Sequence, residues 1–274
     1  MIRFAQIAIA ATALMAAMPA QAADFLIDTT KGASSGNVNG NTITYSVTST
    51  DGKSTLNVKA TGWSRGFDGN YTAGKVEAFD PWGLGVYQAG QNEQNRTNFH
   101  QIDNADGWEF VVLQFDQSVS LQSAVLTPFQ LAGRNYIDDD AFIARGNASF
   151  ASAMSNLTLR NLEASLNYDP SKQSGDAWFN SNSNNDVSVK PYGATNQISN
   201  RQNYNLSPDK SGNVWIIGGS FNGPDGFNDA FKLNQVKVSS GVPEPMTWMT
   251  MILGFGVVGA ALRRRRGAVK AQLA

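Results

Sequence analysis

Acidic and amide side chains gather at three places in the chain, where they could bind a hard cation. These places are Asp103 to Gly107, Asp138 to Asp140, and Asn228-Asp229. Calcium takes about six to eight oxygen ligands from carboxylates, amides and backbone carbonyls, and loops between strands can supply them. Three consecutive aspartates repel one another unless water or a cation screens their charges. We therefore expect a calcium site or, as the alternative, solvated acidic turns; the expected ligands are Asp103, Asp106, Asp138, Asp139 and Asp140.

Residues for catalysis are scarce. The chain has no cysteine and one histidine, His100, with Asp103 three positions further on. A Ser-His-Asp hydrolase also needs a serine presented on a nucleophile elbow. We expect no such elbow in this chain, and we therefore expect His100 to fix a turn with Asp103 and Asn104. Glycoside hydrolysis needs two carboxylates across a cleft, and convergence of two such groups cannot be read from spacing. The glutamates that could take part are Glu77, Glu93, Glu109 and Glu163. We expect a protein that is not an enzyme.

Tryptophans could serve a different function, because flat indole faces stack on sugar rings. Trp215 lies in the apolar run Val214 to Ile217, which predicts a core position. Trp63, Trp82 and Trp178 lie beside glycines, prolines or polar loops. These three are candidate glycan contacts, with local packing as the alternative.

Strands must position these side chains, because the hydrophobic pattern has a period of two. Residues 43–47 alternate between apolar and polar types, and residues 56–60 repeat the pattern after Asp51-Gly52, which predicts a hairpin. The run from Glu109 to Asp116 is apolar on both faces, as in a central strand. Further strands are predicted at residues 119–125, 142–143, 157–162, 214–217 and 231–238, the last with a bulge near Asn234.

The spacing of these runs predicts the fold class. Only residues 149–155 have a mildly helical pattern. Short strands separated by turns rich in Gly, Asn and Ser predict an all-β fold, an antiparallel β-sandwich of jelly-roll type.

Both ends of the chain have the composition of targeting segments. Arg3, the apolar stretch Ile7 to Met18 and Ala20-Gln21-Ala22 predict a signal peptide helix over residues 1–22. Near the other end, an apolar run from Met246 to Leu262 would span roughly 25 Å as a helix. Four arginines follow it, which predicts a transmembrane helix with a cytoplasmic tail over residues 267–274.

The segment between these ends, residues 23–242, is expected to form one exported domain. Six of the 21 basic residues but only one of the 22 acidic residues lie outside it, which leaves the domain a net charge of −6. This charge argues against nucleic acid or anionic membrane surfaces as partners. Because the chain has no cysteine, the exported domain must rely on burial or on bound ions for stability.

The C-terminal segment, residues 243–266, also has a specific arrangement of residues. Pro-Glu-Pro is followed after two residues by Trp, then by an apolar span with glycines and a block of arginines. This order resembles the PEP-CTERM sorting signal of Gram-negative bacteria, in the variant written PEP-x-x-W-A. The resemblance implies that an exosortase-type membrane protease processes the tail, so that the inner membrane holds the chain only transiently; the alternative is an ordinary single-pass anchor. The sorting motif would comprise Pro243, Glu244, Pro245, Trp248, Arg263, Arg264, Arg265 and Arg266.

The exported domain resembles a module found in many PEP-CTERM cargo proteins. The similarity lies in Gly83-Leu84-Gly85-Val86, read as a turn, then His100 to Asn104, Phe110 to Asp116, and Asp229 to Leu233. It implies a secreted β-sandwich without an established enzymatic role. We therefore expect an exported, non-enzymatic protein of the cell surface or the extracellular matrix. The alternative is a carbohydrate-binding module of the exopolysaccharide matrix, and a glycosidase or lyase is the third hypothesis.

Overall fold

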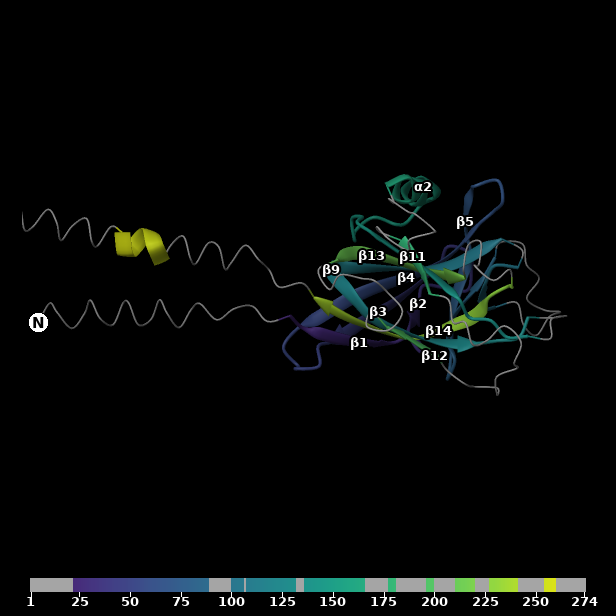
Figure 1. Cartoon of the computed structure of the whole chain (residues 1–274), viewed down its shortest axis with the longest axis horizontal. Coiled ribbons are helices and arrows are strands. Elements are labelled where there is room, and N and C mark those ends of the chain that lie inside the picture. Colours follow the sequence, from purple (N-terminus) through teal and green to yellow (C-terminus); the bar gives the residue numbers. More distant parts are fainter. Residues whose placement is uncertain are drawn as a thin grey trace, which may run out of the picture. The chain divides into compact units, whose positions relative to one another are not determined.

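The computed structural model describes residues 22–88, 100–105, 107–131, 136–165, 177–180, 196–199, 210–219, 227–240 and 254–259 (Figure 1). The chain divides into two units: Ala23–Gly241 form one, and Met1–Ala22 with Val242–Ala274 form the other. Of the second unit the structure describes residue 22 and residues 254–259. The first unit is built mainly of antiparallel strands, as the all-β prediction required. In chain order its elements are β1 (Asp24–Asp28), β2 (Ala33–Ser34), β3 (Thr42–Thr48), β4 (Thr55–Arg65), β5 (Tyr71–Ala73), β6 (Lys75–Phe79), β7 (Gly83–Tyr87), β8 (Ile102–Asp103), β9 (Trp108–Pro128), β10 (Ala141–Gly146), α2 (Asn156–Ser165), β11 (Ala177–Asn180), β12 (Asn196–Ser199), β13 (Gly212–Gly219) and β14 (Ala230–Ser240).

Strand β9 joins two sets of strands. Its first half lies between β4 and β13, where Phe110 is opposite Trp63 on one side and Gly218 on the other. Its second half lies between β14 and β12, where Leu126 is opposite Leu233 and Asn196. From β4 the sheet continues to β3, β2 and β5, from β13 to β10 and β11, and from β14 to β1, β8, β7 and β6. The prediction of a central strand at residues 109–116 is confirmed.

Alternate side chains of β9 pack into two different hydrophobic clusters. Val111, Leu113 and Phe115 belong to the main cluster, together with apolar residues of β1, β3, β13 and β14. Phe110 and Val112 belong to a second cluster on the other face, which includes side chains of α2. All five side chains are fully buried. The run is apolar on both faces because both faces of this half of β9 are covered.

Helix α2 stands where the sequence predicted a strand, and the prediction for residues 157–162 is wrong. Leu159 and Leu162, three positions apart, are buried in the second cluster, whereas Leu157 is 69% exposed. That is the spacing of one helix face, not of a strand. Ser155 caps the helix: its Oγ accepts a hydrogen bond from the N–H of Thr158 at 3.1 Å. The helix therefore begins after the segment 149–155, for which helix was predicted.

Two details of the sequence prediction concern β14 and its neighbour β7. The register between β14 and β9 shifts between Leu233 and Gln235, which confirms the bulge near Asn234. The segment Gly83 to Val86 is not a turn but part of strand β7. Its glycines permit close backbone packing, since a Cβ on Gly85 would lie 1.8 Å from the carbonyl oxygen of His100 and one on Gly83 2.2 Å from that of Leu233.

The targeting segments fall almost entirely outside the described residues. Within the predicted membrane segment 246–262 the structure describes a helix over residues 254–259. Among the described residues, no helix combines the length and the apolar character needed to cross a bilayer. The signal peptide and the transmembrane helix remain predictions.

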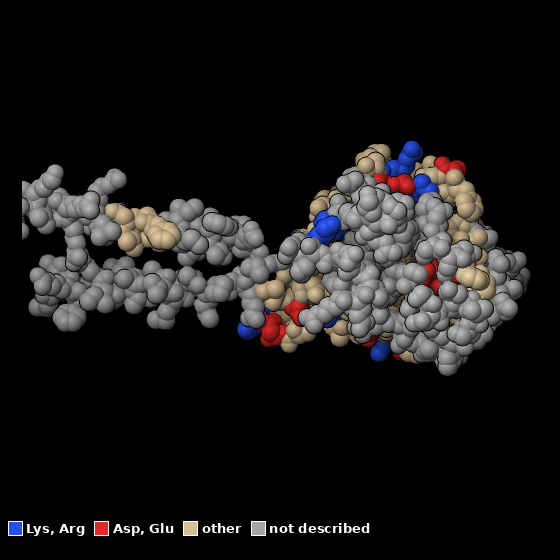
Figure 2. Space-filling model, in the orientation of Figure 1, with Lys and Arg blue, Asp and Glu red and all other residues tan. Residues whose placement is uncertain are grey.

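The surface of the first unit mixes charges of both signs. On the face shown in Figure 2, basic and acidic side chains of the described residues lie interspersed. Ion pairs join some of the charged side chains of this unit: Arg65 contacts Glu163 at 2.9 Å and Lys237 contacts Asp24 at 3.0 Å. On this face the described residues form no large basic patch of the kind that binds nucleic acid.

Candidate metal centre

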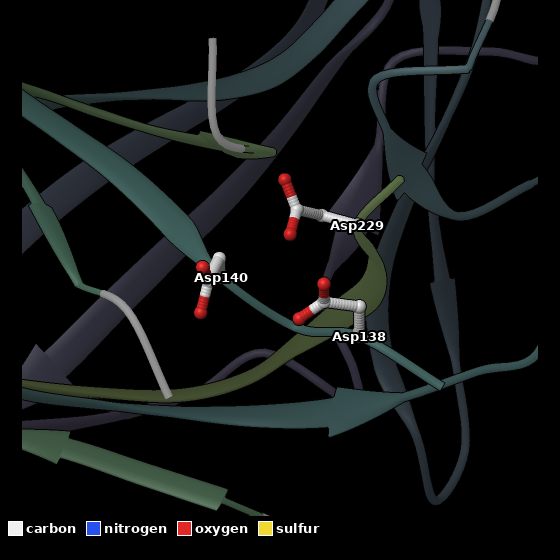
Figure 3. A group of neighbouring side chains, drawn as sticks. All are labelled: Asp138, Asp140 and Asp229. Carbon is white, nitrogen blue, oxygen red and sulfur yellow. The ribbon is translucent and has the colours of Figure 1, made fainter. Parts of the chain in front are cut away.

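Three carboxylates converge where β10 and β14 begin. Asp138 and Asp140 precede β10, and Asp229 immediately precedes β14 (Figure 3). One carboxylate oxygen of each lies within 4.8 Å of those of the other two. Each residue is at most 1% exposed. Three acidic side chains are thus gathered inside the protein, within reach of a single ion.

Backbone pairing holds these residues together. The N–H of Ala230 donates to the carbonyl oxygen of Asp138 at 2.8 Å and fixes the start of β14 to the segment before β10. Asp138 and Asp140 are two positions apart in this segment, so their side chains leave it on the same side. The sheet therefore brings together parts of the chain that are about ninety residues apart.

Asn104, in the loop after β8, ties a third segment to the cluster. Its Nδ2 donates to Oδ2 of Asp229 at 2.6 Å, and its Oδ1 accepts from the N–H of Asp229 at 2.9 Å. Nδ2 of Asn228 also donates to Oδ1 of Asn104 at 3.2 Å. These bonds orient the Asp229 carboxylate and hold the loop after β8 beside it.

The electrostatics of this cluster favour a cation. At the observed separation, two ionised carboxylates repel each other by at least ~3 kcal/mol at an effective dielectric constant of ~20. A divalent ion among them converts this repulsion into attraction. The donors are oxygens, which suit calcium or magnesium rather than softer metals. The chain has no cysteine, and its one histidine lies elsewhere.

The predicted metal ligands divide into those the structure brings together and those it does not. Asp138 and Asp140 lie in the cluster; Asp139 is fully buried but outside it, as expected for the intervening residue of an extended segment. Asp103 is also outside it, and its Oδ1 accepts from the N–H of Ala105 at 3.0 Å. Asp106 lies outside the described residues. Asp229 was absent from the expected ligand set, although Asn228-Asp229 had been recognised as rich in oxygen.

His100 lies in a cluster of aromatic and basic side chains that come from β6, β7 and β14. Its ring centroid is 4.5 Å from that of Phe79 and 5.7 Å from that of Tyr87. Burial lowers the pKa of His100 to about 4; the nearby amines of Lys232 and Lys75 act in the same direction and Glu77 opposes them. A group with so low a pKa is neutral at pH 7 and a weak general base.

Other potential catalytic groups are dispersed. Glu77 pairs with Lys75 at 2.8 Å, Glu163 pairs with Arg65, and Glu109 accepts from the N–H of Asp103 at 3.4 Å. Glu93 lies outside the described residues. The segment Gly32 to Gly36 has the G-x-S-x-G spacing of a nucleophile elbow, but it contains the two-residue strand β2 and leads to strand β3. A nucleophile elbow requires a strand followed by a helix.

The candidate glycan contacts differ in their surroundings. Trp63 is only 6% exposed, packs in the second hydrophobic cluster and donates its Nε1–H to Oγ1 of Thr61 at 3.0 Å. It has no free face for a sugar, which agrees with the alternative of local packing for this residue. Trp82 is half-buried, with its ring edge-on to Phe129 at 6.4 Å. Trp178 pairs with Ile143 through its backbone, and its side chain is not among those described.

The sorting residues Pro243, Glu244, Pro245, Trp248 and Arg263–Arg266 lie outside the described residues. Comparison of the chain with protein-family models, with curated proteins and with solved structures gave no match. The function is therefore argued from this chain's own residues, and the buried carboxylate cluster is the most specific site among those described.

Proposed function

We propose that this chain is an exported, non-enzymatic protein of the cell surface or extracellular matrix, whose domain is stabilised by a bound calcium ion. The observation that carries the proposal is the buried group Asp138, Asp140 and Asp229. The domain would be a β-sandwich of jelly-roll type, in which β9 passes from one layer to the other.

The metal would take the place of a disulfide. Exported domains commonly gain stability from covalent links, and this chain has no cysteine. An ion held by Asp138, Asp140 and Asp229 would fasten the start of β10 to the start of β14, two parts of the chain that are distant in sequence. Since the ligands converge only in the folded chain, binding would contribute directly to folding stability.

Calcium fits better than magnesium. The three carboxylates each bring an oxygen within reach of one ion, and backbone carbonyls or waters would complete the large and flexible coordination shell of calcium. Magnesium requires a smaller octahedral shell and usually retains several waters. Calcium is therefore the ion whose coordination this buried, oxygen-rich group satisfies best.

The termini support export. The proposed signal peptide would direct the chain across the inner membrane, and the sorting motif beginning at Pro243 would hold it there until an exosortase-type protease processes the tail. Both proposals rest on the order of residues at the two ends of the chain. Calcium is abundant outside cells, so export and a site of modest affinity are compatible.

Thermal melting of the full-length chain in millimolar calcium and in chelator tests the calcium proposal. At a hundredfold excess over Kd, a ligand specific for the folded state adds ~2.7 kcal/mol. For a domain of this size we expect calcium to raise the midpoint by about 5–10 °C.

The matched variants are Asp138→Asn/Asp140→Asn and Asp139→Asn. The double variant should lose the calcium-dependent shift, while Asp139→Asn, in the same segment but outside the cluster, should retain it. Equal midpoints of the unmodified chain in calcium and in chelator would contradict a stabilising site.

Carbohydrate binding is the second candidate function. The observation that favours it is a cavity beside α2, whose described lining residues are uncharged and include amides and hydroxyls.

A further inference from the structure

A cavity of about 430 Å³ lies between α2, β9 and the segment 147–154. Each described residue that lines it is uncharged. Its polar residues are Gln114, Asn147, Ser149, Ser152, Thr158 and Asn161, and the side chains of Met154 and Leu162 add an apolar surface. Both of these are less than a tenth exposed and belong to the second hydrophobic cluster, so this surface is part of the core.

Side chains of three strands hold the cavity wall in place. Nε2 of Gln114 on β9 donates to the carbonyl oxygens of Ser149 and Ser152. Asn213 on β13 bonds both backbone groups of Ala148, accepting from its N–H at 2.9 Å and donating to its carbonyl at 2.7 Å. Nζ of Lys59 on β4 donates to the carbonyl of Phe150 at 2.6 Å. A wall fixed at so many points is preorganised for a ligand.

Several polar groups of this wall are available for a ligand. Within the described part of the chain, the Ser149 and Ser152 hydroxyls and the Asn161 side-chain amide make no hydrogen bond to protein. Asn147 uses only its Oδ1, which accepts from the N–H of Asn213 at 3.2 Å, so its Nδ2 donors remain. The cavity thus combines free neutral donors and acceptors with an apolar surface.

This combination specifies the chemistry of the ligand. A charged ligand would lose hydration without finding an opposite charge in the lining. A sugar ring has hydroxyls at its rim, which match amides and hydroxyls, and C–H groups on its faces, which match Met154 and Leu162. The volume lies in the range of small-molecule sites. We propose that this cavity binds one unit of a neutral saccharide.

The inference deepens the matrix function proposed above by naming a ligand class. It rests on that function only for its biological setting, because the cavity shares no residue with the carboxylate cluster. A failure of saccharide binding would leave the calcium-dependent melting unchanged, and loss of calcium binding would leave the cavity's amides in place.

Saturation-transfer NMR and calorimetry on the full-length chain test the proposal, with glucose, galactose, mannose, N-acetylglucosamine and their disaccharides as probes and glucuronate as the charged comparison. The test variant is Asn161→Leu, at an exposed position of α2. The matched control is Asn37→Leu, which makes the same change at an exposed residue lining a second cavity of about 430 Å³, where Lys75 and Glu77 form their ion pair. Ala153→Trp, which fills the first cavity from an exposed position, is a second test variant.

We expect at least one neutral saccharide to bind, with about tenfold weaker affinity in Asn161→Leu, no measurable binding in Ala153→Trp and unchanged affinity in Asn37→Leu. Melting curves would establish that each variant is folded. The proposal is overturned if no neutral probe binds, if glucuronate binds as well as the neutral sugars, or if a folded Asn161→Leu binds as tightly as the unmodified chain.

Discussion

Lys232→Met should stabilise the protein at neutral pH. Lys232 is the third residue of β14 and is 1% exposed, with its Nζ 4.5 Å from the ring centre of Phe79 and 4.2 Å from that of Phe129. Burial lowers the pKa of Lys232 from 10.5 to about 7, against a smaller effect of Glu77 in the opposite direction. Methionine has a similar length, no charge, and a sulfur that packs well against aromatic rings.

The magnitude follows from proton linkage. Each pH unit between the folded and unfolded pKa corresponds to ~1.4 kcal/mol, so charging this amine in the folded state costs about 5 kcal/mol. Replacing Lys232 by Met removes this cost, but it also removes two cation–π contacts, which are worth about 1–2 kcal/mol together. Lys232→Met should therefore raise the free energy of unfolding by about 3 kcal/mol at pH 7.

The pH dependence is the sharper test. Between about pH 7 and pH 10.5 the unfolded chain holds a proton on Lys232 that the folded chain has lost, so the stability of the unmodified protein rises with pH in this window. Below pH 7 both states are protonated and the cost is constant. The pKa of His100 is about 4 in the folded chain and 6.5 ordinarily. Its burial therefore lowers stability as the pH falls from 6.5 to 4, which lies outside this window.

Urea denaturation at pH 7, 8 and 9 would measure both effects. The unmodified chain should gain up to ~1.4 kcal/mol per pH unit, and Lys232→Met should lose most of that slope. Lys53→Met, at a side chain that is 78% exposed, is the matched control and should keep the slope. The reasoning is refuted if Lys232→Met is less stable than the unmodified chain at pH 7, or if its slope is unchanged.

Three further predictions concern the core, the helix and the tail. Phe115→Ala, at a fully buried position of the main cluster, should lower the free energy of unfolding by ~3–5 kcal/mol, and an unchanged denaturant midpoint would show that β9 is not central. Ser155→Ala, which removes the cap of α2, should cost ~1 kcal/mol in the same assay, and equal stability would mean that the cap contributes nothing. Intact-mass spectrometry from the native host should show loss of everything after about Pro245, whereas a mature extracellular chain that retains Arg263–Arg266 would disprove processing.

Local patterns predicted the strands well, because alternation reports which face of a strand is buried. The run 109–116, the hairpin at Asp51-Gly52 and the bulge near Asn234 all follow from residues close in sequence. The helix was misplaced because Leu157 and Leu159 have the spacing of one strand face, whereas Leu159 and Leu162 have the spacing of one helix face. Only the burial of Leu159 and Leu162 in the second cluster decides between the strand and the helix.

The candidate metal centre was predicted in part, because its ligands come from distant segments. Asp138 and Asp140 could be found from composition, but the role of Asp229 depends on how the starts of β10 and β14 meet. Nothing local in the sequence reports that contact. Trp63 shows the same limit: its polar neighbours suggested exposure, whereas pairing of β4 with β9 places it in the core.

The most direct test of the central claim is the metal content of the protein. The full-length chain and Asp138→Asn/Asp140→Asn would each be dialysed to equilibrium against millimolar calcium, and the calcium in excess of the dialysate would be measured by inductively coupled plasma mass spectrometry. We predict about one calcium ion per chain for the unmodified protein and close to none for the variant. No excess calcium in the unmodified protein, or equal amounts in both, would contradict a calcium site at Asp138, Asp140 and Asp229.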